Sequence, residues 1–196
     1  MASEKLYIVP NNTNYGKVNN TDISAYGIPL KPEIEKSMIQ EYSEGGLPYY
    51  TYQVDLSNVT ELPVVITDTF DTDYLEFNKI GDDRWDARAY IAAAEQKNQL
   101  NGGTAPYAAT AVTTEDGIII TANDLPKKDN GHFYEYYRIY YSLKVKDADA
   151  LAALKAQAIA KGGKYTLHNT AVWGDLSDEF DVDYEVTPVR ISRSTS

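Results

Sequence analysis

The sequence contains no cysteine among its 196 residues. This absence excludes disulfide bonds, thiolate metal sites and cysteine nucleophiles together. Histidine is nearly as scarce, because only His132 and His168 occur, and His168 falls on the polar side of its expected strand. A multi-histidine metal site or a Ser-His-Asp triad therefore has few residues to draw on. We predict no metal and no cofactor, and a hydrolase is disfavoured because no nucleophile–histidine pair can be placed.

The chain also lacks a net positive charge and long apolar runs. The net charge of −11 argues against a nucleic-acid partner, which would require a basic face. No apolar run approaches the length of a membrane span. What the chain does have is 43% hydrophobic residues and 17 tyrosines, which are enough to build a sizeable core in one large domain or two small ones.

Period-two alternation and β-branched or aromatic residues predict a mainly β chain. The expected strands are residues 34–39, 49–56, 64–70, 74–77, 133–145, 164–173 and 180–186, with a hairpin of 108–112 and 118–121 across Glu115-Asp116-Gly117. Two segments change to a helical period. The first, 83–100, is rich in Ala and stops at a Gly-Gly pair. The second, 147–161, has Asp147 or Asp149 as its N-cap and an apolar stripe of Leu151, Leu154 and Ile159. The predicted fold is all-β, an elaborated Ig-like β-sandwich with two inserted helices.

The expected organisation has three parts. Residues 1–30 form an N-terminal extension or linker strand, with a short strand candidate at 6–9. Residues 31–188 form the Ig-like domain, and residues 189–196 form a polar tail.

Asp68 is the first residue whose position needs explaining. Side chains alternate across a strand, so Asp68 shares one face of 64–70 with Val64, Ile66 and Phe70. A carboxyl group among inward-facing apolar side chains is unusual. The alternative is a strand that ends at Thr67, with Asp68 beginning the turn that follows.

Two other expected strands carry the same anomaly. Lys36 lies between Ile34 and Met38 on one face, and Asn169 shares a face with apolar neighbours on strand 164–173. Burying any one of these polar groups unpaired costs several kcal/mol. We therefore expect Lys36, Asp68 and Asn169 to meet.

Their chemistry is complementary. A lysine in apolar surroundings loses its proton more easily, and the neutral amine is a nucleophile. A buried aspartic acid has a raised pKa, stays protonated and can polarise an amide carbonyl by donating a hydrogen bond. Attack of Lys36 Nζ on Asn169 Cγ would expel ammonia and leave an amide between the two side chains.

Four segments carry a resemblance to a known family: 32–36 (PEIEK), 50–54 (YTYQV), 66–69 (ITDT) and 167–173 (LHNTAVW). In order and spacing they resemble the isopeptide-forming, Ig-like stalk domains of Gram-positive surface adhesins and pilins, of the collagen-adhesin type. The resemblance spans roughly residues 32–186. It implies that Lys36 is the amine, Asn169 the acceptor and Asp68 the catalytic acid.

The resemblance also implies a function. The chain would be a structural stalk module of an extracellular, cell wall-anchored surface protein, whose signal and anchor lie outside this fragment. Its partners would be neighbouring domains of the same protein and a possible host ligand. It would not be an enzyme, apart from a single autocatalytic turnover on itself.

Three alternatives remain open. Lys31 is a rival amine, but its strand parity is opposite to that of Lys36. Asp68, Asp71 and Asp73 could hold calcium, although the glycine and distal glutamate of a calcium loop are absent. The domain could instead be a ligand-binding adhesin head for a glycan or host matrix protein, using the inserted segment 78–130 or a face with Tyr134, Tyr136 and Tyr140.

Overall fold

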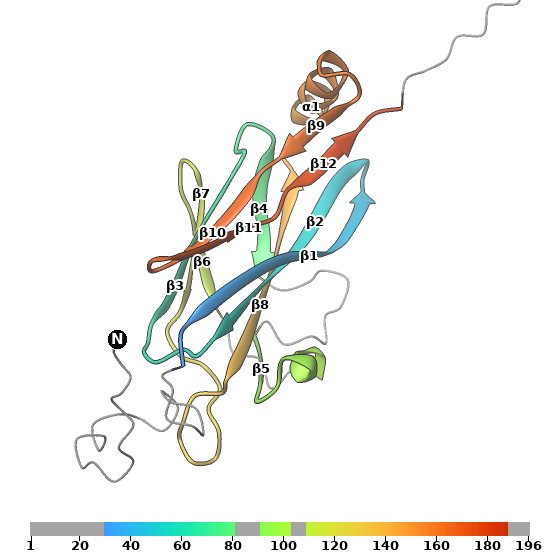
Figure 1. Ribbon diagram of the computed structural model, residues 1–196. Helices are drawn as coiled ribbons and strands as arrows, with labels where there is room; N and C mark the ends of the chain where they lie inside the picture. The colour runs from blue at the N-terminus through green and yellow to red at the C-terminus, as the bar shows by residue number, and fades with distance from the viewer. Residues whose placement is uncertain (1–29, 81–90, 103–108, 188–196) are drawn as a thin grey trace, which may run out of the picture.

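The computed structural model describes residues 30–80, 91–102 and 109–187. Two five-stranded β-sheets face each other, and a two-stranded sheet with helix α1 (Ala148–Ala160) extends from one end (Figure 1). The all-β prediction is therefore confirmed at the level of fold class. The predicted strand at 6–9 and the polar tail at 189–196 lie outside the described residues.

The first sheet has the order β1-β2-β8-β4, and β5 also pairs with β8. Its strands are β1 (Glu33–Glu44), β2 (Leu47–Ser57), β4 (Leu75–Ile80), β5 (Ile91–Ala94) and β8 (Tyr136–Val145). The turn between β1 and β2 places Gly45 and Gly46 at φ of 60° and 83°. Glycine adopts this left-handed conformation without steric penalty, so the chain reverses here and β1 pairs with β2 as a hairpin.

The second sheet has the order β11-β10-β3-β7-β6. Its strands are β3 (Val64–Phe70), β6 (Thr110–Thr113), β7 (Gly117–Ala122), β10 (Asn169–Trp173) and β11 (Leu176–Glu179). The β6–β7 pair is the predicted hairpin. Seven strands, β1-β2-β8-β4 and β11-β10-β3, follow the ABED and GFC order of constant-type Ig sheets, with β5, β6 and β7 added between the fourth and fifth of them.

The predicted strand 164–173 is divided at His168 into β9 (Lys164–Leu167) and β10. β9 pairs with β12 (Val182–Glu185), whereas β10 pairs with β11 and β3. The register of the β9–β12 pair continues without a shift into the β10–β11 pair, so the two form one long ribbon. His168 Nδ1 lies 3.0 Å from Asp181 Oδ1 at the break, and its side chain is 75% exposed, as predicted.

Helix α1 confirms the second predicted helix. Asp147 is its N-cap and accepts a hydrogen bond from Ala150 N at 2.8 Å. Three residues at a spacing of four are buried: Ala150, Leu154 and Ala158. Ile159 is 68% exposed, so the predicted apolar stripe is wrong at that position.

The predicted helix at 83–100 is wrong where the structure describes it. Residues 91–94 form strand β5, and Lys97–Gly102 form a short 3₁₀ helix, η4; residues 83–90 lie outside the described ranges. Alanine favours a helix locally, but β5 pairs with β8 and all four of its residues are buried. Tertiary pairing overrides the local preference here.

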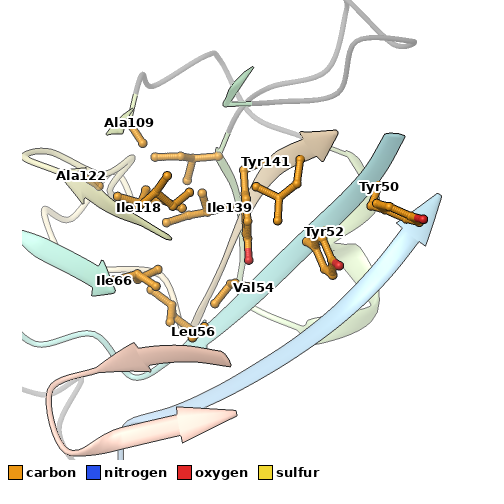
Figure 2. Packing of buried hydrophobic residues seen from close by; sticks show 14 of the residues in the cluster. Tyr50, Tyr52, Val54, Leu56, Ile66, Ala109, Ile118, Ala122, Ile139 and Tyr141 are labelled. Atoms are coloured by element: carbon orange, nitrogen blue, oxygen red, sulfur yellow. The ribbon is translucent and has the colours of Figure 1, made fainter. Parts of the chain in front are cut away.

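The core between the sheets is built from aliphatic side chains and from tyrosines. Tyr50, Tyr52, Tyr137 and Tyr141 are fully buried, and Figure 2 shows three of them among the core side chains of β2 and β8. Such large aromatic side chains supply much of the buried apolar area. Within the described ranges, no helix is both long and apolar enough to cross a membrane.

Candidate cross-linking site

The structure brings Lys36 and Asp68 into contact between the two sheets. Lys36 belongs to β1 of the first sheet and Asp68 to β3 of the second, and Nζ lies 3.1 Å from Asp68 Oδ1. Their residues are 3% and 0% exposed. Strand β3 continues to Phe70, so the alternative in which the strand ends at Thr67 is wrong.

Asn169 lies on β10, the strand beside β3, and is 1% exposed. In the antiparallel register Asp68 is opposite Ala171 and Asn169 is opposite Phe70. Asp68 and Asn169 are therefore diagonal neighbours on the inward face, a relation that places Cα atoms about 7–8 Å apart. All three predicted residues thus point into the same region of the core.

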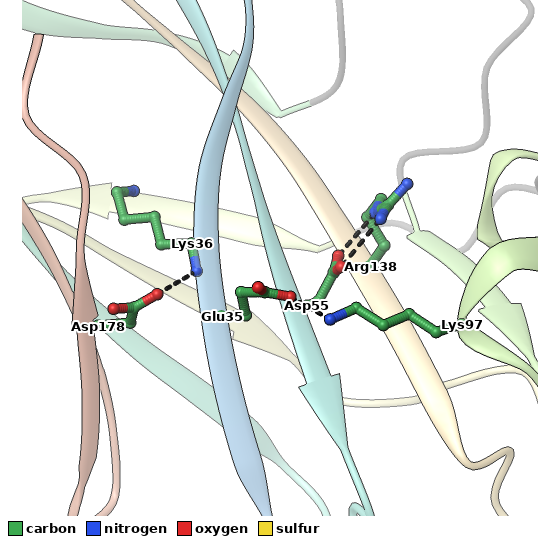
Figure 3. Close-up of polar contacts among 6 residues, drawn as sticks. All are labelled: Glu35, Lys36, Asp55, Lys97, Arg138 and Asp178. Atoms are coloured by element: carbon green, nitrogen blue, oxygen red, sulfur yellow. Dashed lines mark hydrogen bonds and ion pairs between the residues drawn. The ribbon is translucent and has the colours of Figure 1, made fainter.

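A hydrogen bond to the opposite sheet fixes β1 at this position. Lys36 N donates to Asp178 Oδ2 on β11 at 2.7 Å, so an edge of the first sheet is held against an edge of the second. Figure 3 shows the Lys36 and Glu35 side chains leaving β1 in opposite directions. Glu35 is exposed and pairs with Lys97, which confirms that it faces away from the core.

Two tyrosines enclose the lysine amine. The rings of Tyr52 and Tyr141 stack at 5.6 Å between centroids, and Lys36 Nζ lies 4.4 Å and 4.6 Å from them. Tyr141 Oη also contacts Nζ and donates a hydrogen bond to Asp68 Oδ1 at 2.8 Å. In the sequence both tyrosines share a strand face with apolar residues, Tyr52 with Val54 and Tyr141 with Ile139, but this alternation gives no sign that Tyr141 reaches the site.

The surroundings favour the neutral forms of both groups. Burial lowers the pKa of Lys36, opposed by the nearby carboxyls of Asp68 and Asp178. Burial also raises the pKa of Asp68 to about 6, with smaller opposing contributions from Lys36 and Asn169. Transfer of one proton from the ammonium to the carboxylate converts the ion pair into a free amine and a carboxylic acid without changing the net charge.

Three polar atoms of the site have no hydrogen bond of normal geometry among the described residues. They are Asp68 Oδ2, Asn169 Oδ1 and Asn169 Nδ2, and all are buried. A buried polar group without a partner costs about 1–3 kcal/mol. The unpaired atoms lie on the carboxyl that would act as the acid in the expected reaction and on the amide that the amine would attack.

The rival residues occupy different surroundings. Lys31 is exposed. Asp71 accepts hydrogen bonds from Tyr165 Oη at 3.0 Å and from Asp73 N at 3.2 Å, so both carboxylate oxygens have protein donors. In the part of the chain that the structure describes, no group of three or more acidic or histidine residues is arranged to hold a metal ion.

The predicted tyrosine face is also different from the expectation. Tyr140 is 2% exposed, beneath β5 and η4, and Tyr134 and Tyr136 are half-buried. The segment 78–130 contributes β5 to the first sheet and β6 and β7 to the second. The strands of this segment are thus part of the two sheets.

No family model matches the sequence, and no curated protein matches it. The solved structures that are similar in part include two bacterial adhesins. The N-terminal domain of the Streptococcus gordonii adhesin Sgo0707 aligns with 80% of this chain at 12% identity and a TM-score of 0.38. The Actinomyces fimbrial adhesin FimA aligns with 83% at 16% identity and a TM-score of 0.28. The matches cover 32% and 52% of those chains, so this chain corresponds to about a third and about half of their length.

Proposed function

We propose that this chain is an Ig-like structural module of a bacterial surface adhesin or pilus stalk, stabilised by an intramolecular isopeptide bond between Lys36 Nζ and Asn169 Cγ. Asp68 is the catalytic acid. One observation carries the proposal: a buried lysine–aspartate contact lies beside a buried amide whose oxygen and nitrogen both lack a hydrogen bond of normal geometry among the described residues. The resemblance in sequence supports the placement in a surface protein, where neighbouring domains and a host ligand are the expected partners.

The reaction balances without a cofactor or an oxidant. The neutral Lys36 amine attacks Asn169 Cγ while Asp68 donates its proton to the amide oxygen. The tetrahedral intermediate then collapses, the bond from Cγ to Nδ2 breaks, and ammonia leaves with a proton released by Nζ. Asp68 is protonated again at the end, so it acts as a true catalyst of a single turnover.

The packing of the two sheets supplies much of the rate. Reacting groups that are held in position gain up to several orders of magnitude over the same groups free in solution. The low-dielectric core also favours the neutral amine, which is the nucleophilic form. Folding therefore assembles the site, and the reaction follows folding.

The bond would tie β1 to β10 across the sandwich and close a loop of 169 − 36 = 133 residues. Treated like a disulfide of similar loop length, it contributes roughly 5 kcal/mol to the free energy of unfolding. Such a bond survives reducing conditions, which suits a chain without cysteine. Force applied near the termini would pass through the amide, and the residues between positions 36 and 169 would carry little load.

Single-molecule force spectroscopy on tandem copies of the chain tests this function. We expect the wild-type chain to show almost no extension from residues 36–169, whereas Asp68→Ala unfolds with a full-length step. Equal contour-length gains in the two proteins would contradict the stalk function.

A further inference from the structure

The two oxygens of the Asp68 carboxyl have unlike surroundings. Oδ1 accepts hydrogen bonds from Lys36 Nζ at 3.1 Å and from Tyr141 Oη at 2.8 Å. Oδ2 is buried and has no partner among the described residues. The carboxyl is therefore polarised by its contacts before any reaction takes place.

We propose that Tyr141 is a positioning residue that decides which oxygen of Asp68 carries the proton. Two donors are already directed at Oδ1, so a proton on that oxygen would be repelled by their hydrogen atoms. The acid proton therefore belongs on Oδ2. Asn169 is the diagonal neighbour on β10, and its amide oxygen also lacks a hydrogen bond of normal geometry within the described ranges. Tyr141 thereby presents the acidic oxygen to the amide that has to be activated. This inference rests on the proposed cross-link.

The same hydroxyl orients the amine. Tyrosine has one O–H donor and can accept hydrogen bonds on the same oxygen. The donor is used on Asp68 Oδ1, so the contact with Nζ is one in which Tyr141 Oη accepts. A neutral amine has two N–H groups and one lone pair. With its N–H groups held by Tyr141 Oη and Asp68 Oδ1, the lone pair is left free for attack.

Tyr52 is the comparison that separates the hydroxyl of Tyr141 from its ring. Both rings stack against each other and lie at nearly the same distance from Lys36 Nζ, 4.4 Å and 4.6 Å. Both hydroxyls are buried, but no hydrogen bond of normal geometry joins Tyr52 Oη to Asp68 or to another described residue, and its side chain interacts with that of Asn169. The aromatic enclosure is shared, whereas the contact with the carboxyl belongs to Tyr141.

A pH profile distinguishes this role from simple packing. The groups that face Asp68 are Lys36, Tyr141 and Asn169, with Tyr52 against the amine and Asp178 acting on Lys36 from β11. In its reactive state the pair of Lys36 and Asp68 shares one titratable proton, because the amine is neutral and the carboxyl is protonated. The rate should fall as the pH drops through about 6, because the pair then takes up a second proton and the amine is charged. We call this low-pH side of the pH–rate profile the acid limb. Removing the Tyr141 donor destabilises the Asp68 carboxylate, so the acid limb should move to higher pH.

The test follows bond formation in the full chain after cell-free synthesis, with samples transferred to buffers from about pH 5 to pH 9, a range on either side of the Asp68 pKa. Intact mass reports the loss of ammonia over time. We expect Tyr141→Phe to react about tenfold more slowly, as for the loss of one hydrogen bond, with its acid limb displaced upward. Tyr50→Phe is the matched control, because it also removes a buried tyrosine hydroxyl from the core, but one that has no hydrogen-bond partner among the described residues, and it should react like the wild type.

A second substitution keeps the proposal testable if Tyr141→Phe does not fold. A 3-fluorotyrosine placed at position 141 keeps the shape and makes the hydroxyl a stronger donor, so the acid limb should move to lower pH. An unchanged rate and limb in the folded Tyr141→Phe chain, or an unchanged limb with 3-fluorotyrosine, would overturn the role of Tyr141 and leave the cross-link intact. A wild-type chain that never loses ammonia would instead overturn the proposed function.

Discussion

Two buried or nearly buried ion pairs lie on opposite faces of the first sheet. On the outer face, Arg138 donates from Nε to Asp55 Oδ1 at 2.6 Å and from Nη2 to Asp55 Oδ2 at 2.9 Å. On the inner face, Lys36 meets one oxygen of Asp68, and the other oxygen has no hydrogen-bond partner among the described residues. Figure 3 shows the two-bond geometry of the outer pair.

The pairs differ in what they can do chemically. The hydrogen bonds that Arg138 donates to Asp55 raise the pKa of Arg138, and a guanidinium cannot become a neutral nucleophile in a protein. Burial lowers the pKa of Lys36, which favours the neutral amine. A buried charge pair alone is therefore no sign of reactivity. The unpaired atoms beside it and the identity of the cation are what distinguish the inner pair.

The largest expected effect comes from removing the acceptor. Asn169→Ala leaves Lys36 with no electrophile, so the chain should keep its full sequence mass. Without a closed loop of 133 residues, the free energy of unfolding should fall by roughly 5 kcal/mol. Denaturant unfolding of Asn169→Ala beside the wild type measures this difference. A loss below about 1 kcal/mol would mean that residues 36 and 169 are not covalently joined.

Asp68→Asn should also prevent the bond but cost less stability. The substitution removes the acid. It also removes the free-energy cost of burying a carboxyl group, whose pKa is raised to about 6 by that burial. We expect a folded chain of full mass with a melting temperature between those of the wild type and Asn169→Ala. Complete cross-linking of Asp68→Asn would assign the acid role to another residue.

Gly117→Ala tests how closely the second sheet holds Asp68. A Cβ atom at Gly117 on β7 would lie 2.0 Å from the Asp68 carbonyl oxygen, so β3 and β7 would have to separate. We expect a loss of about 2–3 kcal/mol in stability, typical of overpacking, and slower cross-linking. Gly174→Ala is the control, because a Cβ atom there would meet nothing within 4 Å and only the φ of 59° opposes the change, at about 1–2 kcal/mol. Cross-linking of Gly117→Ala at the wild-type rate would contradict this placement of Asp68.

The smallest effect should come from the outer pair. Asp55→Asn weakens the contact with Arg138 and should cost about 1–2 kcal/mol, because Arg138 keeps partial access to water with its side chain 11% exposed. The cross-link should form to completion, as shown by intact mass. Failure of Asp55→Asn to lose ammonia would remove the distinction between the two pairs.

Strand parity alone is enough to predict the three central residues. Lys36, Asp68 and Asn169 each interrupt an apolar face, and a polar residue in such a position is visible in one sequence. Asp178 and the Tyr141 hydroxyl could not be found this way, because their roles depend on how one sheet lies over the other. Many tyrosines share the inward parity of Tyr141, and parity does not say which of them meets a carboxyl.

The fold is predictable to a similar depth. Capping and glycine signals locate α1, and the β6–β7 hairpin follows from its turn residues. The helix expected over 91–94 is wrong because its alanines favour a helix locally, whereas pairing with β8 and burial on both faces decide the structure. Pairing between distant strands is not encoded in the local sequence pattern.

The most direct test of the central claim is the intact mass of the purified wild-type chain, followed by a peptide map. We predict a mass lower than the sequence mass by one ammonia, and one branched peptide that contains both Lys36 and Asn169. A chain of full sequence mass, with the Lys36 and Asn169 peptides recovered separately, would contradict the account.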